Sequence, residues 1–416
     1  MKGKNRERVA PRRLAPKSWI NRRYDVRVPQ IPEQDMLQMG EFMNLHIGSQ
    51  MNISPSLIGF VPGMEPHMFQ LIHKFINTMQ KAMYPVENCI DLNEDGRCWY
   101  EGFCRDPAFG QTVWHSARAF FNISKSNAME SVTNMEINKA IVMLRQKLAY
   151  PGFLITDSTI FTVLALAMIS EAFRDYEAAK QHIHGLYQMI KLRGGINALS
   201  QKHPLQLKCC RLDLMFALQT ASKPLFFAEN SLSWEAYLPK HERLPTVTPL
   251  DTLDDATDWR LINVWHDLRE LITAINLAHQ TKRKLSSTLF QEALVSVQYR
   301  LQHLTYEICD QHEVLRLALL VFSTTTFFHA RLISTCYRDF LRHLDIILHS
   351  TDYYLDERSS KLILWFIFVS RLSGIYTPED YSWMRKQVLQ ISRSLKLKLI
   401  LVGLVPVTSL RGSPHS

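Results

Sequence analysis

The segment Thr156–Ser200 places the strongest constraint on how this chain can fold. Its first part, Ser158–Phe173, is predicted to be a helix with apolar side chains on every side, and such a helix has to be buried from all directions. The next part, Tyr176–Leu192, is amphipathic, because its apolar residues recur at helical spacing. Gly194 and Gly195 follow directly and suit the left-handed turn that ends a helix. We therefore expect a central helix covered by a surface helix.

Helical periodicity recurs in many segments from Pro66 onward, and no segment shows convincing strand alternation. Asp157 and Asp175 precede the two central helices and are predicted to cap them. Further helices are predicted over Pro66–Met83, Pro107–Phe121, Glu130–Ala149, Leu205–Ala221, Asp258–His279, Thr288–Gln311, Glu313–Phe340, Ser359–Gly374 and Pro378–Lys398. The sequence thus predicts an all-α fold, a large helical domain of roughly a dozen helices packed as antiparallel pairs.

Three regions differ in composition. Residues 1–35 form a basic, Pro-punctuated arm with little apolar periodicity, which is typical of a disordered segment. Residues 36–400 form the helical domain, with a candidate subdivision at the Pro-containing connection 222–256, and residues 401–416 form a tail. The absence of an apolar leader at the amino end argues against secretion, and the run Leu362–Val369 is too short to cross a membrane. Seven irregularly spaced cysteines favour reduced, intracellular thiols.

The positive charge is concentrated in the arm. Ten basic residues and only two acids, Glu7 and Asp25, give the first 30 residues a charge of +8, which leaves +1 of the total +9 for the remaining chain. Such a cluster is typical of a nuclear localisation patch read by an import receptor, or of weak contact with DNA phosphates. The candidate residues are Lys2, Lys4, Arg6, Arg8, Arg12, Arg13, Lys17, Arg22, Arg23 and Arg27.

One pattern favours a different class of protein. The sequence DDATD places Asp254, Asp255 and Asp258 where three carboxylates of an all-α enzyme could hold Mg²⁺ against a prenyl diphosphate, as in terpene cyclases. The matching second metal motif is missing, since His266 stands between Asn263 and Glu270 where Ser or Thr is needed. Acids at this position also suit the start of the following helix, whose free N–H groups they would cap. We expect the capping role, no metal or other cofactor and no catalytic residue.

Several segments, in order, resemble the regulatory domain of fungal-specific transcription factors. The segment GLYQMIKLRGG, Gly185–Gly195, is similar to the family's helix with a Leu-Arg-Gly-Gly-like end, which makes Arg193, Gly194 and Gly195 structural motif residues. The segment DPAFGQTVWHSA over 106–117 resembles its Asp-Pro-Ala helix start. The segment Cys210–Phe226 resembles its Arg-x-Asp helix, which includes Asp213. The resemblance covers about residues 65–375.

The chain departs from this family at the DNA-binding module. A binuclear zinc cluster needs six closely spaced cysteines, and Cys89, Cys98 and Cys104 are too widely separated to supply them. The resemblance therefore implies a nuclear regulator of transcription that contacts DNA weakly through its arm or acts through another transcription factor, as a monomer or homodimer. Control of a specialised-metabolite gene cluster is an expectation from the resemblance alone. A helical interaction protein without a role at DNA is the remaining alternative.

Overall fold

The computed structural model describes residues 65–83, 86, 89–91, 107–126, 131–150, 154–172, 175–220, 222–239, 257–307, 310–327 and parts of 360–368 and 385–393. The basic arm, Asp254, Asp255 and the tail lie outside these residues. The helices are α3 (Pro66–Met83), α5 (Pro107–Ser126), α6 (Ser131–Leu148), α7 (Asp157–Ala172), α8 (Tyr176–Leu192), α9 (His203–Thr220), α10 (Trp259–Thr281), α11 (Ser287–His303) and α12 (Gln311–Phe327). Two short 3₁₀ helices, η3 (Ile196–Lys202) and η4 (Glu229–Ser231), complete them.

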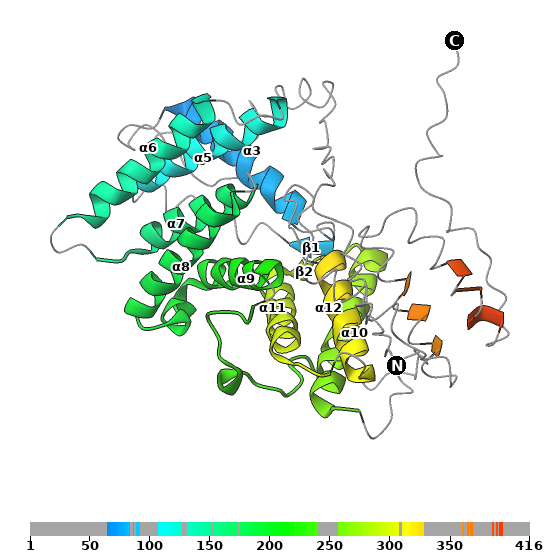
Figure 1. The fold of residues 1–416 in the computed structure, drawn as a ribbon. Helices are drawn as coiled ribbons and strands as arrows, with labels where there is room; N and C mark the ends of the chain where they lie inside the picture. Colours follow the sequence, from blue (N-terminus) through cyan, green and yellow to red (C-terminus); the bar gives the residue numbers. More distant parts are fainter. Residues whose placement is uncertain are drawn as a thin grey trace, which may run out of the picture.

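The all-α prediction is confirmed, and consecutive helices pack against one another. The pairs α5–α6, α7–α8, α10–α11 and α11–α12 each lie in contact, and α9 joins the two halves through α7 and α11. Figure 1 shows α3, α5 and α6 together at one end of the described part, and α10, α11 and α12 together at the other. In the described part of the chain, no helix combines the length and the hydropathy needed to span a bilayer.

Two differences from the expected helices and strands bear on the fold. The helix expected over Thr288–Gln311 ends at His303, because Leu304 is extended and a new helix begins at Gln311, where Asp310 accepts the N–H of His312 at 2.9 Å. A short parallel ladder also exists, since β1 (Ile90–Asp91) pairs with β2 (Leu285–Ser286). Two-residue strands are too short to show any alternation in a sequence, so this pairing depends on tertiary contact.

The central hairpin is built as the sequence predicts. Ile160, Leu164 and Leu186 are fully buried, and α8 turns its polar side outward. The hairpin ends on a Schellman motif, in which the Gly195 N–H bonds to the Ile190 carbonyl at 2.9 Å and the Gly194 N–H to the Lys191 carbonyl at 3.1 Å. Both glycines have positive φ, +106° at Gly194 and +90° at Gly195.

One of the two predicted helix caps is correct. The Asp175 carboxylate accepts the N–H of Ala178 at 3.0 Å and caps α8. Asp157 does not cap α7, because the hydroxyl of Thr156 accepts the Thr159 N–H at 3.3 Å instead. Asp157 forms an ion pair with Arg193 at the far end of α8. That contact links the first residue of α7 to the turn after α8, as expected for two antiparallel helices.

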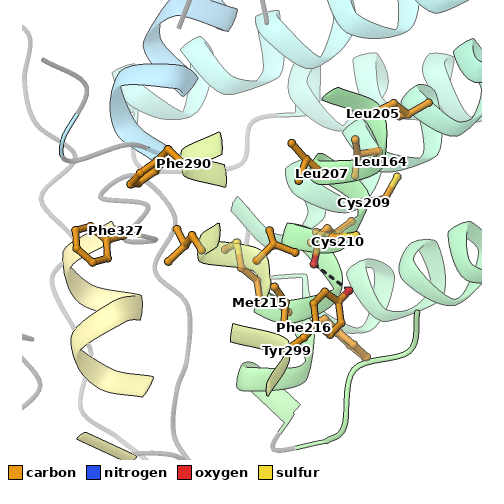
Figure 2. Close-up of a cluster of buried hydrophobic side chains, with 14 of the residues drawn as sticks. Leu164, Leu205, Leu207, Cys209, Cys210, Met215, Phe216, Phe290, Tyr299 and Phe327 are labelled. Carbon is orange, nitrogen blue, oxygen red and sulfur yellow. Dashed lines mark hydrogen bonds between the residues drawn. The ribbon is translucent and has the colours of Figure 1, made fainter. Parts of the chain in front are cut away.

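A second helix, α9, is as deeply buried as α7. Cys209, Leu214 and Leu205 have no exposed surface, and Arg211 and Asp213 are also buried. Figure 2 shows side chains of α9 beside Leu164 of α7 and Tyr299 of α11, with Phe290 of α11 and Phe327 of α12 to one side. The helix therefore forms the interior of the molecule and carries two charges into it.

Candidate functional site

The most elaborate polar arrangement in the described part of the chain holds down the connection 222–239. This segment runs from α9 towards α10 and crosses α11. Two buried carboxylates, Asp213 on α9 and Asp267 on α10, each accept two consecutive backbone N–H groups from it. The N–H groups of a loop have no hydrogen-bond partner within a helix. A buried carboxylate that accepts two of them therefore satisfies the donors of the loop and its own acceptor oxygens at the same time.

Asp213 fixes the first half of the connection. Its Oδ1 accepts the Leu225 N–H at 2.7 Å and its Oδ2 accepts the Phe226 N–H at 3.0 Å. The Tyr299 hydroxyl of α11 donates a third hydrogen bond to Oδ2 at 2.7 Å. Burial raises the pKa of Asp213 above its ordinary value, although all three hydrogen bonds favour the charged form. The ring of Phe227 packs edge-on against Tyr299, at 4.9 Å between centroids.

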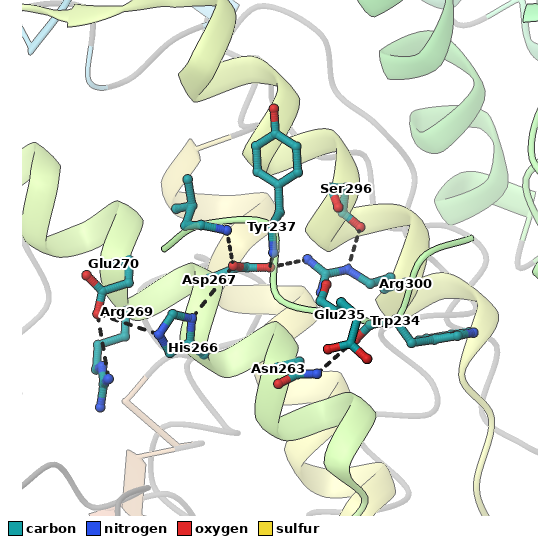
Figure 3. A network of polar contacts seen from close by, with 11 residues as sticks. Trp234, Glu235, Tyr237, Asn263, His266, Asp267, Arg269, Glu270, Ser296 and Arg300 are labelled. Carbon is teal, nitrogen blue, oxygen red and sulfur yellow. Dashed lines mark hydrogen bonds and ion pairs between the residues drawn. The ribbon is translucent and has the colours of Figure 1, made fainter. Parts of the chain in front are cut away.

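Asp267 fixes the second half in the same way. It accepts the N–H groups of Tyr237 at 2.9 Å and Leu238 at 2.8 Å, and it forms an ion pair with the Arg300 guanidinium. Arg300 also donates to the carbonyl of Glu235 at 3.2 Å. Figure 3 shows these groups converging on Asp267. The side chain of Arg300 is 1% exposed and that of Asp267 is fully buried. Because water does not solvate either charge, each needs the opposite charge of its partner to be stable.

We call Asp213 with its hydrogen-bond partners the first clamp and Asp267 with its partners the second clamp. Both clamps include a side chain of α11. Tyr299 and Arg300 are neighbours on α11, and each supplies the side-chain donor for one carboxylate. At the surface, the Tyr237 hydroxyl donates to Glu292 at 2.7 Å, and His203 pairs with the other oxygen of Glu292 at 2.7 Å. The side chains of Asp213, Tyr299, Asp267 and Arg300 all bond to other groups of the protein. The arrangement therefore positions the backbone of the connection and holds α9, α10 and α11 together.

The motif residues taken from the family resemblance are structural where the structure describes them. Asp213 forms the first clamp, Gly194 and Gly195 form the helix stop, and Arg193 pairs with Asp157. Arg193, Gly194 and Gly195 lie together in the turn after α8, and Asp213 lies apart from them on α9. The ten basic residues of the arm lie outside the described residues, so their roles stay predictions.

Asp258 takes the capping role expected for it. It is the N-cap of α10, and its carboxylate accepts the N–H of Arg260 at 2.9 Å and the Tyr306 hydroxyl at 2.6 Å. It also forms a two-pronged ion pair with the Arg260 guanidinium. Burial opposes the charged form, but these hydrogen bonds outweigh it and lower the pKa of Asp258 to about 2. Both carboxylate oxygens are thus committed to protein donors.

The cysteines that the structure describes belong to the core. Cys209 and Cys210 are buried, and burial raises the pKa of Cys210 to about 12 and that of Cys209 as well. A thiol held in its neutral form is a poor nucleophile and a poor metal ligand. Within the described ranges, no group of three or more His, Cys, Asp or Glu side chains is placed to hold a metal ion.

Sequence reasoning missed Asp267, Tyr299 and Arg300. A usable signal was present, because Asp267 interrupts the apolar face formed by Val264, Leu268 and Leu271 on α10. A charge on the buried face of a helix needs a partner. The partner on α11 could not be identified from spacing alone. No protein-family model matches this chain, and neither a curated protein nor a solved structure is significantly similar to it.

Proposed function

We propose that this protein is a nuclear regulator of transcription whose helical body binds a partner, while its basic arm directs import and contacts DNA phosphates. The observation that carries the proposal is the charge of +8 within the first 30 residues, ahead of a body rich in helical periodicity. A cluster of cations at this density attracts polyphosphate backbones without reading sequence. It also matches the composition that import receptors bind.

The described body supports a binding role more than a catalytic one. Its buried carboxylates at Asp213 and Asp267 accept hydrogen bonds from the backbone, and Asp258, the third acid of DDATD, caps helix α10. The resemblance to fungal regulatory domains agrees with this picture, since its motif residues Gly194 and Asp213 serve the architecture. A rigid helical body is suited to presenting a surface to a partner.

The test compares four forms of the full-length tagged protein: wild type, a deletion of residues 1–28, the same deletion with an unrelated nuclear import signal, and a variant with all ten arm cations changed to Gln. We expect the deletion and the Gln variant to lose nuclear accumulation. Unchanged localisation of both would overturn the proposal.

Genome-wide occupancy by chromatin immunoprecipitation then separates the two roles of the arm. If the arm contacts DNA, the form with the unrelated import signal enters the nucleus but occupies fewer sites than wild type. If occupancy returns to the wild-type level, the arm serves import only and the body reaches DNA through a partner. Absence of specific occupancy for the wild-type protein would contradict a role at chromatin.

A further inference from the structure

The helices α3, α5 and α6 carry an excess of positive charge that the rest of the body lacks. Their sequences contain seven cations and a single acid, Glu136, a net charge of +6. The helices α7 to α12 contain eight cations and eight acids, a net charge of zero. The seven cations are Lys74, Lys81, Arg118, Lys125, Lys139, Arg145 and Lys147.

Between α5 and α6 lies an open groove of about 420 Å³. The apolar part of its lining comes from α6, with Met135, Val142 and Met143, and His115 of α5 and Lys139 of α6 are among its polar members. Met135 and Val142 are each 49% exposed. Methionine side chains adapt to ligands of varied shape, which is why they are common in grooves that bind helices.

Among the described elements, helix α6 packs mainly against α5 and only slightly against α7. Figure 1 shows it at the outer edge of this end of the described part. Met135 and Val142 are seven residues apart and so lie on one side of the helix, with Arg145 one turn further on. Arg145 is exposed. Leu148, on another side of α6, is 38% exposed, and Tyr150, which follows the end of α6, is 73% exposed.

We propose that the α5–α6 groove binds an amphipathic helix of a partner protein that carries acidic residues beside its apolar stripe. An apolar stripe at i, i+3, i+4 and i+7 would fill the groove through Met135 and Val142, as in other helix-in-groove complexes. The acids on its flanks would meet Lys139, which lines the groove, and the exposed Arg145 of α6. Attraction between these opposite charges speeds association and fixes orientation. A nucleic acid is the weaker candidate, because a phosphate backbone gains nothing from the exposed apolar residues along α6.

The inference rests on the part of the proposed function in which the helical body binds a partner, and not on the role of the arm. Under that proposal nuclear accumulation depends on the arm, whereas Gln111, the first residue that lines this groove, lies more than 70 residues along the chain from it. Loss of peptide binding with normal localisation, or the reverse, therefore distinguishes a failure of one proposal from a failure of the other.

The experiment measures fluorescence anisotropy of a labelled helical peptide of about 20 residues, with Leu at the stripe positions and Glu on both flanks. The titrant is the full-length protein. We expect saturable binding that weakens as salt is raised, because salt screens the attraction between exposed charges. The same peptide with Lys in place of Glu should bind at least tenfold more weakly. Equal binding of the two peptides, or no saturable binding of the acidic one, would overturn the proposal.

Variants of the protein place the binding site. Val142→Glu and Met135→Glu introduce a carboxylate into the groove at exposed positions, and each should weaken binding of the acidic peptide at least tenfold. The matched control is Leu277→Glu on α10, where the native side chain is 47% exposed, and it should bind as wild type does. Thermal unfolding of each variant verifies that the fold is intact. Wild-type affinity in both groove variants would refute the assignment.

Two other occupants are tested with the same proteins. A labelled 20-base-pair DNA duplex that displaces the peptide, and whose own binding is abolished by Val142→Glu, would assign the groove to nucleic acid. A concentration-dependent dimer in sedimentation that Val142→Glu dissociates would assign it to a second copy of this chain. Either result would overturn the proposal of an acidic helix.

Discussion

A single buried carboxyl near the end of α7 should make the stability of this protein depend on pH. The side chain of Glu171 is 2% exposed, and its Oε1 has no hydrogen-bond partner among the described residues. Burial raises the pKa of Glu171 from 4.5 to about 7. The folded protein therefore keeps this proton between pH 4.5 and 7, where the unfolded chain has already released it.

The sign and the size of the effect follow from this difference. Because folding takes up a proton in that window, stability falls as pH rises from 4.5 to 7 and then stays low. A pKa raised from 4.5 to about 7 corresponds to about 3 kcal/mol, at about 1.4 kcal/mol per pKa unit. Glu171→Gln removes the titration and keeps the size of the side chain. Relative to wild type, the variant should therefore gain about 3 kcal/mol between pH 4.5 and pH 8.

Urea unfolding of both proteins at several pH values measures this gain, because other titrating groups cancel in the difference between them. The control is Glu235→Gln, the same substitution at an exposed carboxylate, where there is no burial to relieve. If the difference between Glu171→Gln and wild type is flat from pH 4.5 to 8, Glu171 is not desolvated in the folded protein and the reasoning is refuted.

Three further predictions concern the turn, the second clamp and the cap. Gly194→Val should destabilise the protein by about 1–3 kcal/mol in urea unfolding, because the φ angle of Gly194 is +106°. The control Gly185→Ala, inside α8, should be neutral or stabilising. Equal effects of the two substitutions would contradict the Schellman geometry. Asp267→Ala leaves the Arg300 charge buried without its partner and should cost about 3–5 kcal/mol by the same measurement. Asp258→Asn should lower the thermal midpoint relative to wild type at pH 6, and by less at pH 3. The pKa of Asp258 is lowered to about 2 in the folded protein, so its contribution to stability decreases as the unfolded chain takes up protons below about pH 4. A difference between variant and wild type that grows on acidification would refute this.

The distribution of charge shows where sequence reasoning stops. Summed along the chain, the residues after the first 30 carry a net charge of only +1 and look balanced. In the fold, the positively charged helices α3, α5 and α6 pack together, so the balance holds for the body as a whole but not for this end of it. Net charge is a sum over sequence, whereas an electrostatic surface depends on which elements are neighbours.

What the sequence determined by itself is local. Periodicity predicted the helical class, the bounds Tyr176–Leu192 of α8 and the burial of α7, because side-chain spacing on a helix is set by the chain alone. The glycines at 194 and 195 predicted the helix stop for the same reason, since only their own backbone is involved. The capping role of Asp258 also follows from its position at the start of α10.

What only the tertiary structure decided involves groups far apart in sequence. Asp213 and Tyr299 are 86 positions apart and Asp267 and Arg300 are 33 apart, and no spacing rule links either pair. The break of the predicted helix after His303 likewise comes with distant contacts, since the Tyr306 hydroxyl reaches Asp258. Buried charges must find partners, but which partner is near depends on how the helices pack, and that information appears only when the chain is folded.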